Sequence, residues 1–227
     1  MADIEVISLG YEFLKKLNLT DKITLKINSL GDTNSRLTYR KVLIDYLNDY
    51  KFQLSKDSIK RLSENPLRIL DSKNEIDQKI LINAPNVLDY LNEASKERFQ
   101  NVCEGLNVLK IKYEIDKNLV RGLDYYCHTA FEFITDQLGA QGTVLAGGRY
   151  DGLSKMLGGE DVAGVGWAAG IERLALMVQS EYINNPDIVL MAQTKVYNHL
   201  LLPIMNELVN QGFKVEIIYT GNMSKKF

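Results

Sequence analysis

The stretch that decides the fold is Gly164-Val165-Gly166-Trp167-Ala168-Ala169-Gly170-Ile171-Glu172-Arg173-Leu174, in which small residues lead directly into an apolar helix. It is superficially similar to the glycine fingerprint of dinucleotide-binding folds, but that fingerprint requires a parallel strand-helix-strand unit around it. The segments before this stretch predict an antiparallel sheet instead. We therefore interpret it as a strand followed by a helix, with Arg173 in the first helical turn.

The antiparallel sheet is predicted from β-branched and aromatic runs that are separated by glycine-containing loops, at residues 111–115, 125–134 and 143–146. Apolar residues at helical spacing over residues 4–17 predict a helix near the start of the chain. Alternation over residues 23–27 then predicts a strand, which ends at the turn-like Asn28-Ser29-Leu30-Gly31-Asp32.

Residues from about 35 to 108 carry a helical pattern that is broken at Pro66 and Pro85, which predicts a mostly helical insertion. Beyond Pro186, a strand at 188–191, a helix and a strand at 215–219 predict the start of a separate α/β domain, with a right-handed parallel crossover.

The predicted fold class is therefore α+β, in two parts. Residues 1–182 would form a partial antiparallel-sheet domain with the helical insertion, and residues 186–227 would form the beginning of the α/β domain. The sequence stops soon after a turn at Gly221, so that second domain would have only a small part of its sheet.

Composition describes a globular chain of 227 residues with 45% hydrophobic residues and a formal net charge of −2. Bulk charge gives no indication of RNA binding. Cys103 and Cys127 are too few for a disulfide framework, and with the well-separated His128 and His199 they form no zinc pattern. Because no signal peptide or apolar stretch of roughly 20 residues is present, we expect a reduced, cytoplasmic protein without a membrane segment.

Two further stretches carry side chains suited to ligand binding. The first, Arg121-Gly122-Leu123-Asp124-Tyr125-Tyr126, lies at the start of a predicted strand. Alternation would put Arg121 and Tyr125 on one face and Asp124 and Tyr126 on the other, unless the glycine introduces a bulge. The arginine fork could bind a carboxylate or phosphate, and a tyrosine hydroxyl could orient a polar ligand. The alternative is a surface arginine beside two half-buried tyrosines.

The second stretch is Ala146-Gly147-Gly148-Arg149-Tyr150-Asp151-Gly152-Leu153, where glycines would let the backbone approach a ligand closely. Taken alone, this stretch is most simply interpreted as a turn that enters a helix. Arg173 could lie against the phosphates or the adenine ring of a nucleotide. The alternative there is a packing site at the helix start, with Glu172 favourable near the positive end of the helix dipole.

Taken together and in this order, the three stretches resemble histidyl-tRNA synthetases, which are class II aminoacyl-tRNA synthetases. Arg-Gly-Leu-Asp-Tyr-Tyr is similar to the histidine-specific signature of that family, Ala-Gly-Gly-Arg-Tyr-Asp-Gly-Leu to a second one, and Gly-x-Gly-x-x-x-Gly-x-Glu-Arg to the third class II motif. The resemblance runs along the whole chain, including Asn65-Pro66-Leu67-Arg68-Ile69-Leu70-Asp71-Ser72-Lys73 in the helical insertion.

The resemblance implies a class II catalytic domain, the start of an anticodon-binding domain, and the substrates histidine, ATP and tRNA(His), with Mg²⁺ accompanying ATP. It also implies a homodimer. Arg121 would be the catalytic residue that contacts the substrate carboxylate and the α-phosphate. The remaining roles it implies are histidine binding by Tyr125, Tyr126, Tyr150, Gly147 and Gly148, and ATP binding by Arg173, Glu172 and Gly170.

The first two class II motifs, which build the dimer interface and supply a further ATP-binding arginine, are expected upstream of residue 1. We therefore expect that the 227-residue chain does not charge tRNA by itself. Two alternatives remain open: the regulatory paralogue of the same fold that assists ATP phosphoribosyltransferase, and an interaction protein derived from a synthetase. The 121–126 signature and the α/β start after Pro186 argue against the paralogue.

Overall fold

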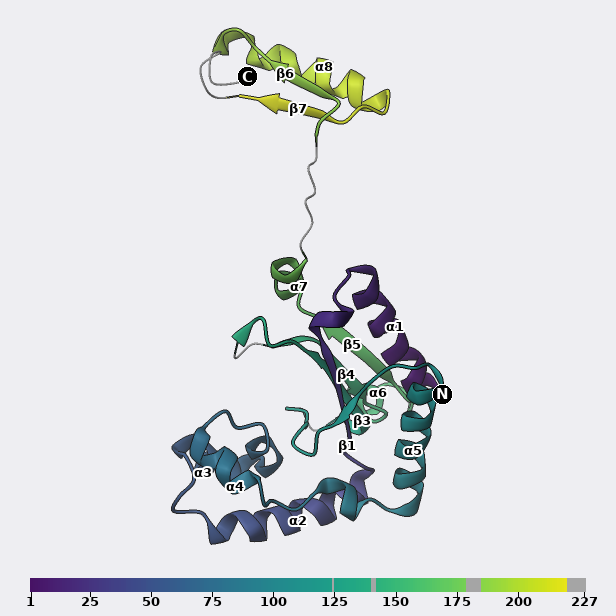
Figure 1. The fold of residues 1–227 in the computed structure, drawn as a ribbon, viewed down its shortest axis with the longest axis vertical. Coiled ribbons are helices and arrows are strands. Elements are labelled where there is room, and N and C mark those ends of the chain that lie inside the picture. Colours follow the sequence, from purple (N-terminus) through teal and green to yellow (C-terminus); the bar gives the residue numbers. More distant parts are fainter. Residues whose placement is uncertain (124, 140–141, 179–184, 220–227) are drawn as a thin grey trace. The chain divides into compact units, whose positions relative to one another are not determined.

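The computed structural model describes residues 1–123, 125–139, 142–178 and 185–219 (Figure 1). The chain divides into two compact units, Met1–Val178 and Gln179–Phe227. The predicted boundary at residues 182–186 falls mostly on 179–184, which lie outside the described residues. Each unit is described by itself.

The first unit is built on a five-stranded sheet with the order β2-β1-β3-β4-β5. Its strands are β1 (Thr24–Ser29), β2 (Glu114–Ile115), β3 (Cys127–Ile134), β4 (Thr143–Arg149) and β5 (Val165–Ala169). The pairs β1·β3, β3·β4 and β4·β5 are antiparallel, as predicted, whereas β2 pairs parallel to β1 over two residues. The predicted turn at 28–32 begins later than expected, because Asn28 and Ser29 still belong to β1.

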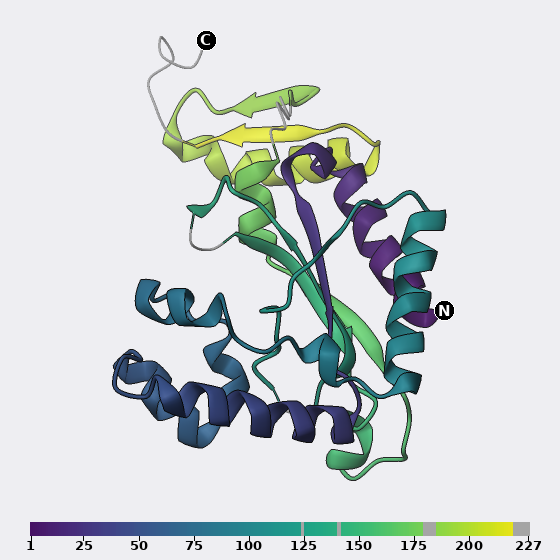
Figure 2. The ribbon, with the colours of Figure 1, turned by 60° about the horizontal axis from the view of Figure 1, so that its bottom comes forward.

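Two helices, α1 (Ala2–Lys16) and α5 (Glu93–Val108), lie side by side along the sheet (Figures 1 and 2). The main core forms where they pack on the strands, and its fully buried members include Ile7, Leu14, Leu106, Phe131 and Phe133. Phe131 and Phe133 alternate with the half-buried Glu132, so β3 presents an apolar face to the helices and a polar face away from them.

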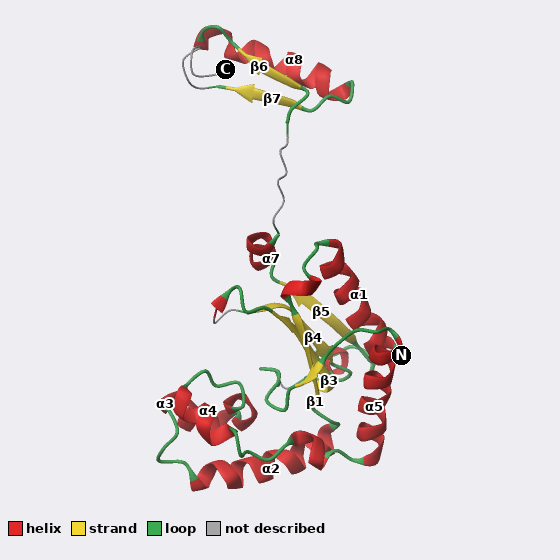
Figure 3. Ribbon diagram, viewed as in Figure 1, coloured by secondary structure: helices red, strands yellow, loops and turns green. Residues whose placement is uncertain are grey.

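The helical segment has a hydrophobic core of its own, centred on Tyr39, Leu43, Leu47, Ile69 and Leu81. Its elements are α2 (Thr33–Asp49), α3 (Lys56–Glu64), α4 (Glu75–Leu81) and the 3-10 helices η2 (Pro66–Ile69) and η3 (Val87–Tyr90), and Figure 3 shows them as the helices apart from the sheet. Each predicted proline break interrupts the helical pattern, with Pro66 at the start of η2 and Pro85 between α4 and η3.

The predicted insertion of residues 35–108 therefore needs one correction. Val102 and Leu106 of α5 are buried in the sheet core and do not belong to the core of the helical segment. The helical pattern continues through α5, but its apolar face packs on the sheet, and a one-dimensional pattern carries no information about that choice.

The second unit contains β6 (Ile188–Met191), α8 (Asn198–Asn210) and β7 (Val215–Ile218). β6 and β7 pair in parallel, so the predicted strand-helix-strand unit is confirmed. The predicted turn at Gly221 and the end of the chain lie outside the described residues. Among the helices that the structure describes, none is long and apolar enough to cross a membrane.

Candidate active site

Arg121 lies over the polar face of the sheet and is held by three acceptors. Its Nε donates to the carbonyl oxygen of Gly147 at 3.1 Å, its Nη1 donates to Glu132 Oε1 at 2.6 Å, and its Nη2 donates to the carbonyl oxygen of Phe131. The arginine side chain is 11% exposed and the Glu132 side chain 21%. A guanidinium carries five N–H groups, so two remain for a ligand.

The predicted alternation over residues 121–126 is wrong, because the described residues of this range, 121–123 and 125–126, precede β3 and belong to no strand. β3 itself starts with a bulge between Cys127 and Ala130. His128 in this bulge has a φ of 47°, and its N–H donates to the carbonyl oxygen of Gly31 at 2.8 Å. The bulge redirects the chain, which a regular period of two cannot anticipate. Asp124 lies outside the described residues.

Three tyrosines from two of the predicted stretches form a cluster. The ring centroids of Tyr125 and Tyr126 lie 4.7 Å apart, and the Tyr150 ring stands edge-on at 6.3 Å from the first and 6.1 Å from the second. Burial, together with the neighbouring Tyr125, raises the pKa of Tyr126 above its ordinary value. Its hydroxyl therefore stays protonated at neutral pH and can donate a hydrogen bond.

Gly147 and Gly148 lie inside β4, whereas Asp151 and Gly152 form a turn that enters α6 (Leu153–Met156). The default interpretation of a turn that enters a helix is therefore confirmed only for the end of this stretch. A Cβ on Gly147 would meet the carbonyl oxygen of Gly166 at 2.3 Å and Phe131 Cζ at 2.6 Å. A Cβ on Gly148 would meet the carbonyl oxygen of Thr129 at 2.7 Å and Tyr126 Cδ1 at 3.1 Å. These glycines let the neighbouring strands and Tyr126 pack closely on β4, while the approach of a ligand to this backbone stays a prediction.

The strand-then-helix prediction for residues 164–174 is confirmed, since β5 leads into α7 (Ile171–Met177) with Gly170 at its N-cap. Arg173 Nη1 donates to the carbonyl oxygen of Thr143 at 2.6 Å. The hydroxyl of Thr143 in turn donates to Glu132 Oε2 at 3.0 Å. Arg121 and Arg173 are thus linked through Glu132 and Thr143, whereas Glu172 is exposed on the first turn of α7.

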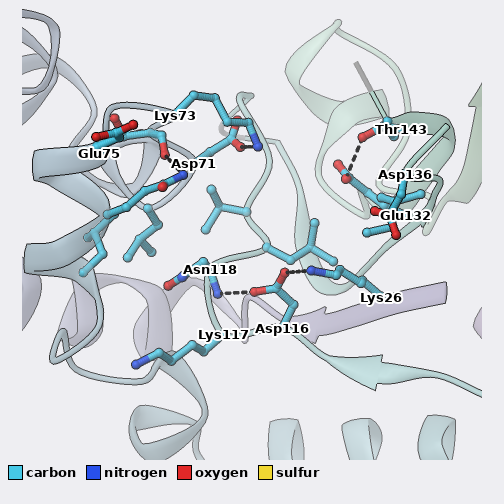
Figure 4. A pocket seen from close by; sticks show the side chains of 18 of the residues that line it. Lys26, Asp71, Lys73, Glu75, Asp116, Lys117, Asn118, Glu132, Asp136 and Thr143 are labelled. Atoms are coloured by element: carbon cyan, nitrogen blue, oxygen red, sulfur yellow. Dashed lines mark hydrogen bonds and ion pairs between the residues drawn. The ribbon is translucent and has the colours of Figure 1, made fainter. Parts of the chain in front are cut away.

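An open pocket of about 1140 Å³ lies beside this linked group. Glu132, Thr143 and Arg173 belong to its lining, and so do residues of the helical segment and of the chain that follows β2. Figure 4 shows Asp71, Lys73 and Glu75 across the pocket from Glu132 and Thr143, with Lys26 and Asp116 between them. Carboxylates and cations therefore mix along the walls.

Arg149 is a second buried arginine in this part of the sheet, on the side of the helices. Its Nε and Nη2 donate to the two carboxylate oxygens of Asp3 at 2.9 and 2.6 Å, and its Nη1 donates to Asp151 Oδ1 at 2.8 Å. Asp151 Oδ1 also accepts from the N–H of Gly164 at 3.1 Å. These bonds connect α1, the end of β4 and the chain that enters β5, next to Tyr150.

The pKa values of this pair follow from competing effects. Burial alone would raise the pKa of Asp3, but hydrogen bonds from Arg149 and Thr129 outweigh it and lower the pKa. The hydrogen bond with Asp3 raises the pKa of Arg149, so both groups stay charged.

Sequence reasoning missed Glu132, Thr143 and the Asp3–Arg149 pair. For Glu132 a signal existed: it is the only charged residue in Ala130-Phe131-Glu132-Phe133-Ile134, and a carboxylate that faces away from two buried aromatic residues requires a partner. For Asp3 no such signal existed, because its partner lies 146 positions further along the chain.

Mg²⁺ was expected only from the chemistry of ATP. Within the part of the chain that the structure describes, no group of three or more His, Cys, Asp or Glu side chains is arranged to hold a metal ion. We therefore assign no magnesium ligand to these residues and derive no step through the ion.

Known proteins match this chain over most or all of its length. The family model described as histidyl-tRNA synthetase matches residues 1–174. The chain is 47% identical over 227 residues to histidine–tRNA ligase of Rhodospirillum rubrum and 45% identical over 227 residues to that of Rickettsia rickettsii. Each match covers all of this chain and only 55% of the relative. The chain therefore spans about half the length of these proteins.

Solved structures give the same result. The apo histidyl-tRNA synthetase of S. aureus matches with a TM-score of 0.67 and 31% identity, over 99% of this chain and 56% of that one. A protein of Bacillus halodurans described as an ATP phosphoribosyltransferase regulatory subunit/histidyl-tRNA synthetase matches with a TM-score of 0.57 over 95% of this chain and 58% of that one. At 18% identity, this second match shows the fold alone. The family model and the relatives together show that the chain belongs to the histidyl-tRNA synthetase family.

Proposed function

We propose that this chain supplies the histidine-binding half of a histidine–tRNA ligase site, in which histidine is activated by ATP and then transferred to tRNA(His). The observation that carries the proposal is the linked group Arg121, Glu132, Thr143 and Arg173. It unites stretches far apart in the sequence on one face of the sheet, beside a pocket and a tyrosine cluster.

In the activation step, a carboxylate oxygen of histidine forms a bond to the α-phosphorus of ATP while the bond from that phosphorus to pyrophosphate breaks. Negative charge develops on the α-phosphate oxygens during this exchange. Arg121 is held from one side by Glu132 and two carbonyl groups, so its two remaining N–H groups need no reorganisation to meet that charge.

The tyrosine cluster would form the wall that reads the amino acid. Hydroxyl groups that would lose hydrogen bonds on binding an apolar amino acid discriminate more strongly than an apolar wall does. Tyr126 suits this role because its half-buried ring carries a hydroxyl group that is protonated at neutral pH and can donate a hydrogen bond. Arg173 would bind the ATP phosphates, and its hydrogen bond to the carbonyl oxygen of Thr143 holds the guanidinium beside the pocket.

Further parts of the proposal rest on the family resemblance. Gly147, Gly148 and Gly170 would let the backbone approach the ligands, and Glu172 would lie near the ATP. The second unit would begin the anticodon-binding domain, and the working enzyme would be a cytoplasmic homodimer that uses ATP with Mg²⁺.

The test is a hybrid enzyme, because the chain spans about half the length of its relatives. This chain replaces the matching region of the Rhodospirillum rubrum ligase, and histidine-dependent exchange of pyrophosphate with ATP is measured. We expect activity in the hybrid and a loss of about 100-fold or more in kcat/KM on Arg121→Ala. A hybrid that folds but exchanges pyrophosphate equally well with and without Arg121 would contradict the proposal.

A further inference from the structure

The loop that carries Arg121 runs between the sheet and the helical segment. On the sheet side, Asn28 Nδ2 of β1 donates to the carbonyl oxygen of Leu119 at 3.0 Å. On the other side, Lys117 Nζ donates to the carbonyl oxygen of Ile82 at 2.7 Å. Val120 packs against both the core of the helical segment and the small cluster of Leu30, Leu119 and Ala130. The loop is therefore held from two sides.

Arg36 makes the contact closest to the tyrosine cluster. Its Nη1 donates to the carbonyl oxygen of Tyr126 at 2.8 Å. Arg36 lies in the first turns of α2, whose N-cap Asp32 accepts from the N–H of Ser35 at 2.8 Å and from Asn92 Nδ2 at 2.9 Å. Since these bonds fix the start of α2 against the chain before α5, Arg36 offers the loop a rigid donor.

Arg68, in the stretch Asn65-Pro66-Leu67-Arg68-Ile69-Leu70-Asp71-Ser72-Lys73, adds a packing contact. A Cβ built on Gly122 would lie 3.4 Å from Cζ, Nε and Nη2 of Arg68 alike, so the face of the guanidinium covers the glycine. The carbonyl oxygen of Arg68 accepts from Arg61 Nη1 at 3.0 Å, which ties η2 to α3. Arg36 and Arg68 of the helical segment thus reach the main chain on either side of residue 124, at Tyr126 and Gly122.

We infer that Arg36, assisted by Arg68, is a positioning residue for the proposed histidine pocket, and that the helical segment sets the affinity for histidine through it. The inference rests on the proposed function. Arg36 holds the carbonyl group of Tyr126, and the position of that peptide determines where the Tyr126 ring meets Tyr125 and Tyr150. Because residues 119–123 and 125–126 lie in neither a helix nor a strand, their placement depends on such contacts from neighbouring elements.

The first experiment measures the loop directly in the 227-residue chain, without any ligand. Hydrogen exchange of the backbone amides of residues 119–127 is compared between the wild type, Arg36→Met and Lys41→Met. Lys41 is an exposed cation of the same helix and is the matched control. We expect Arg36→Met to accelerate exchange in this loop about tenfold and to leave β3 and β4 unchanged, and Lys41→Met to change neither.

The second experiment measures histidine affinity in the hybrid enzyme. Arg36→Met should raise the KM for histidine about tenfold and change kcat by less than about threefold, and Arg36→Lys should recover part of the KM. Arg68→Met should give a smaller rise in the same direction. A change in overall stability alone would not separate KM from kcat, nor would it be relieved by lysine.

The outcomes are distinguishable. Unchanged exchange in the loop of Arg36→Met overturns the inference whatever the enzyme does. Faster exchange with an unchanged KM for histidine also overturns it, because the loop would then move without affecting the pocket. If Arg121→Ala leaves the KM and kcat unchanged as well, the proposed function has failed in addition. Faster exchange together with a raised KM supports the inference.

Discussion

Two arginines on opposite faces of one sheet each form an ion pair with a carboxylate, but their surroundings differ. Arg149 faces the helices, meets the carboxylates of Asp3 and Asp151, and is 8% exposed against 4% for Asp3. Arg121 faces away from the helices, meets Glu132 and two carbonyl groups, and lies beside the pocket that Glu132 lines. Each guanidinium makes three hydrogen bonds within the protein, so the surroundings distinguish them. Arg149 is enclosed between α1 and the sheet, whereas Arg121 lies beside a pocket, where its remaining N–H groups can meet a ligand.

The largest effect is expected from Asp3→Ala, which leaves Arg149 buried without its main partner. Removing one member of a buried ion pair costs about 3–5 kcal/mol, so the free energy of unfolding should fall by that amount. Urea denaturation of the 227-residue chain measures it. Asp151→Ala is the matched control and should cost less, because the Asp151 side chain is 33% exposed. Equal losses in the two variants would show that burial does not distinguish the two carboxylates.

Gly147→Ala tests the strand that lies between the two arginines. The new methyl group would clash with the carbonyl oxygen of Gly166 at 2.3 Å and with Phe131 at 2.6 Å, so we expect a loss of about 1–3 kcal/mol in stability. The same strand supplies a carbonyl group to Arg121, so the variant should also weaken histidine binding in the hybrid enzyme. Gly152→Ala is the control, since a Cβ there meets nothing within 4 Å. A Gly147→Ala protein as stable as this control would contradict the close strand packing.

Glu132→Gln tests the ion pair that Arg121 forms beside the pocket. The amide retains the shape and one acceptor but removes the charge, so the loss in stability should be about 1–2 kcal/mol, less than for Asp3→Ala. The free energy of unfolding is again measured in urea. If Glu132→Gln destabilised the chain more than Asp3→Ala did, the Arg121–Glu132 pair would contribute more to stability than the Arg149–Asp3 pair, and the comparison would be wrong.

The smallest effect concerns pH. The pKa of Asp3 in the folded chain is lowered below its ordinary value of 3.8, so its contribution to stability is present above that value and is lost as the pH falls through the folded pKa. The difference in unfolding free energy between the wild type and Asp3→Asn should therefore be constant near neutral pH and shrink in acid. A difference that stays constant into acid would contradict a lowered pKa.

How much the sequence determined depends on the range of the interaction. Residues 164–174 predict a strand and a helix because small and apolar residues follow local periods, and the structure confirms both. Aromatic residues favour extended structure and so predict a strand from Tyr125, but β3 begins at Cys127, with a bulge up to Ala130 that depends on pairing with β4.

The sequence by itself determined the fold class, most of the elements and the three stretches that carry the family resemblance, since these are properties of neighbouring residues. Only the tertiary structure decided that α5 packs on the sheet, that Glu132 and Thr143 join Arg121 to Arg173, and that Arg36 reaches the loop of Arg121. The physical reason is that a hydrogen bond or an ion pair requires two groups to meet in space. Asp3 and Arg149 stand 146 positions apart, and only the packing of α1 against the sheet brings them together.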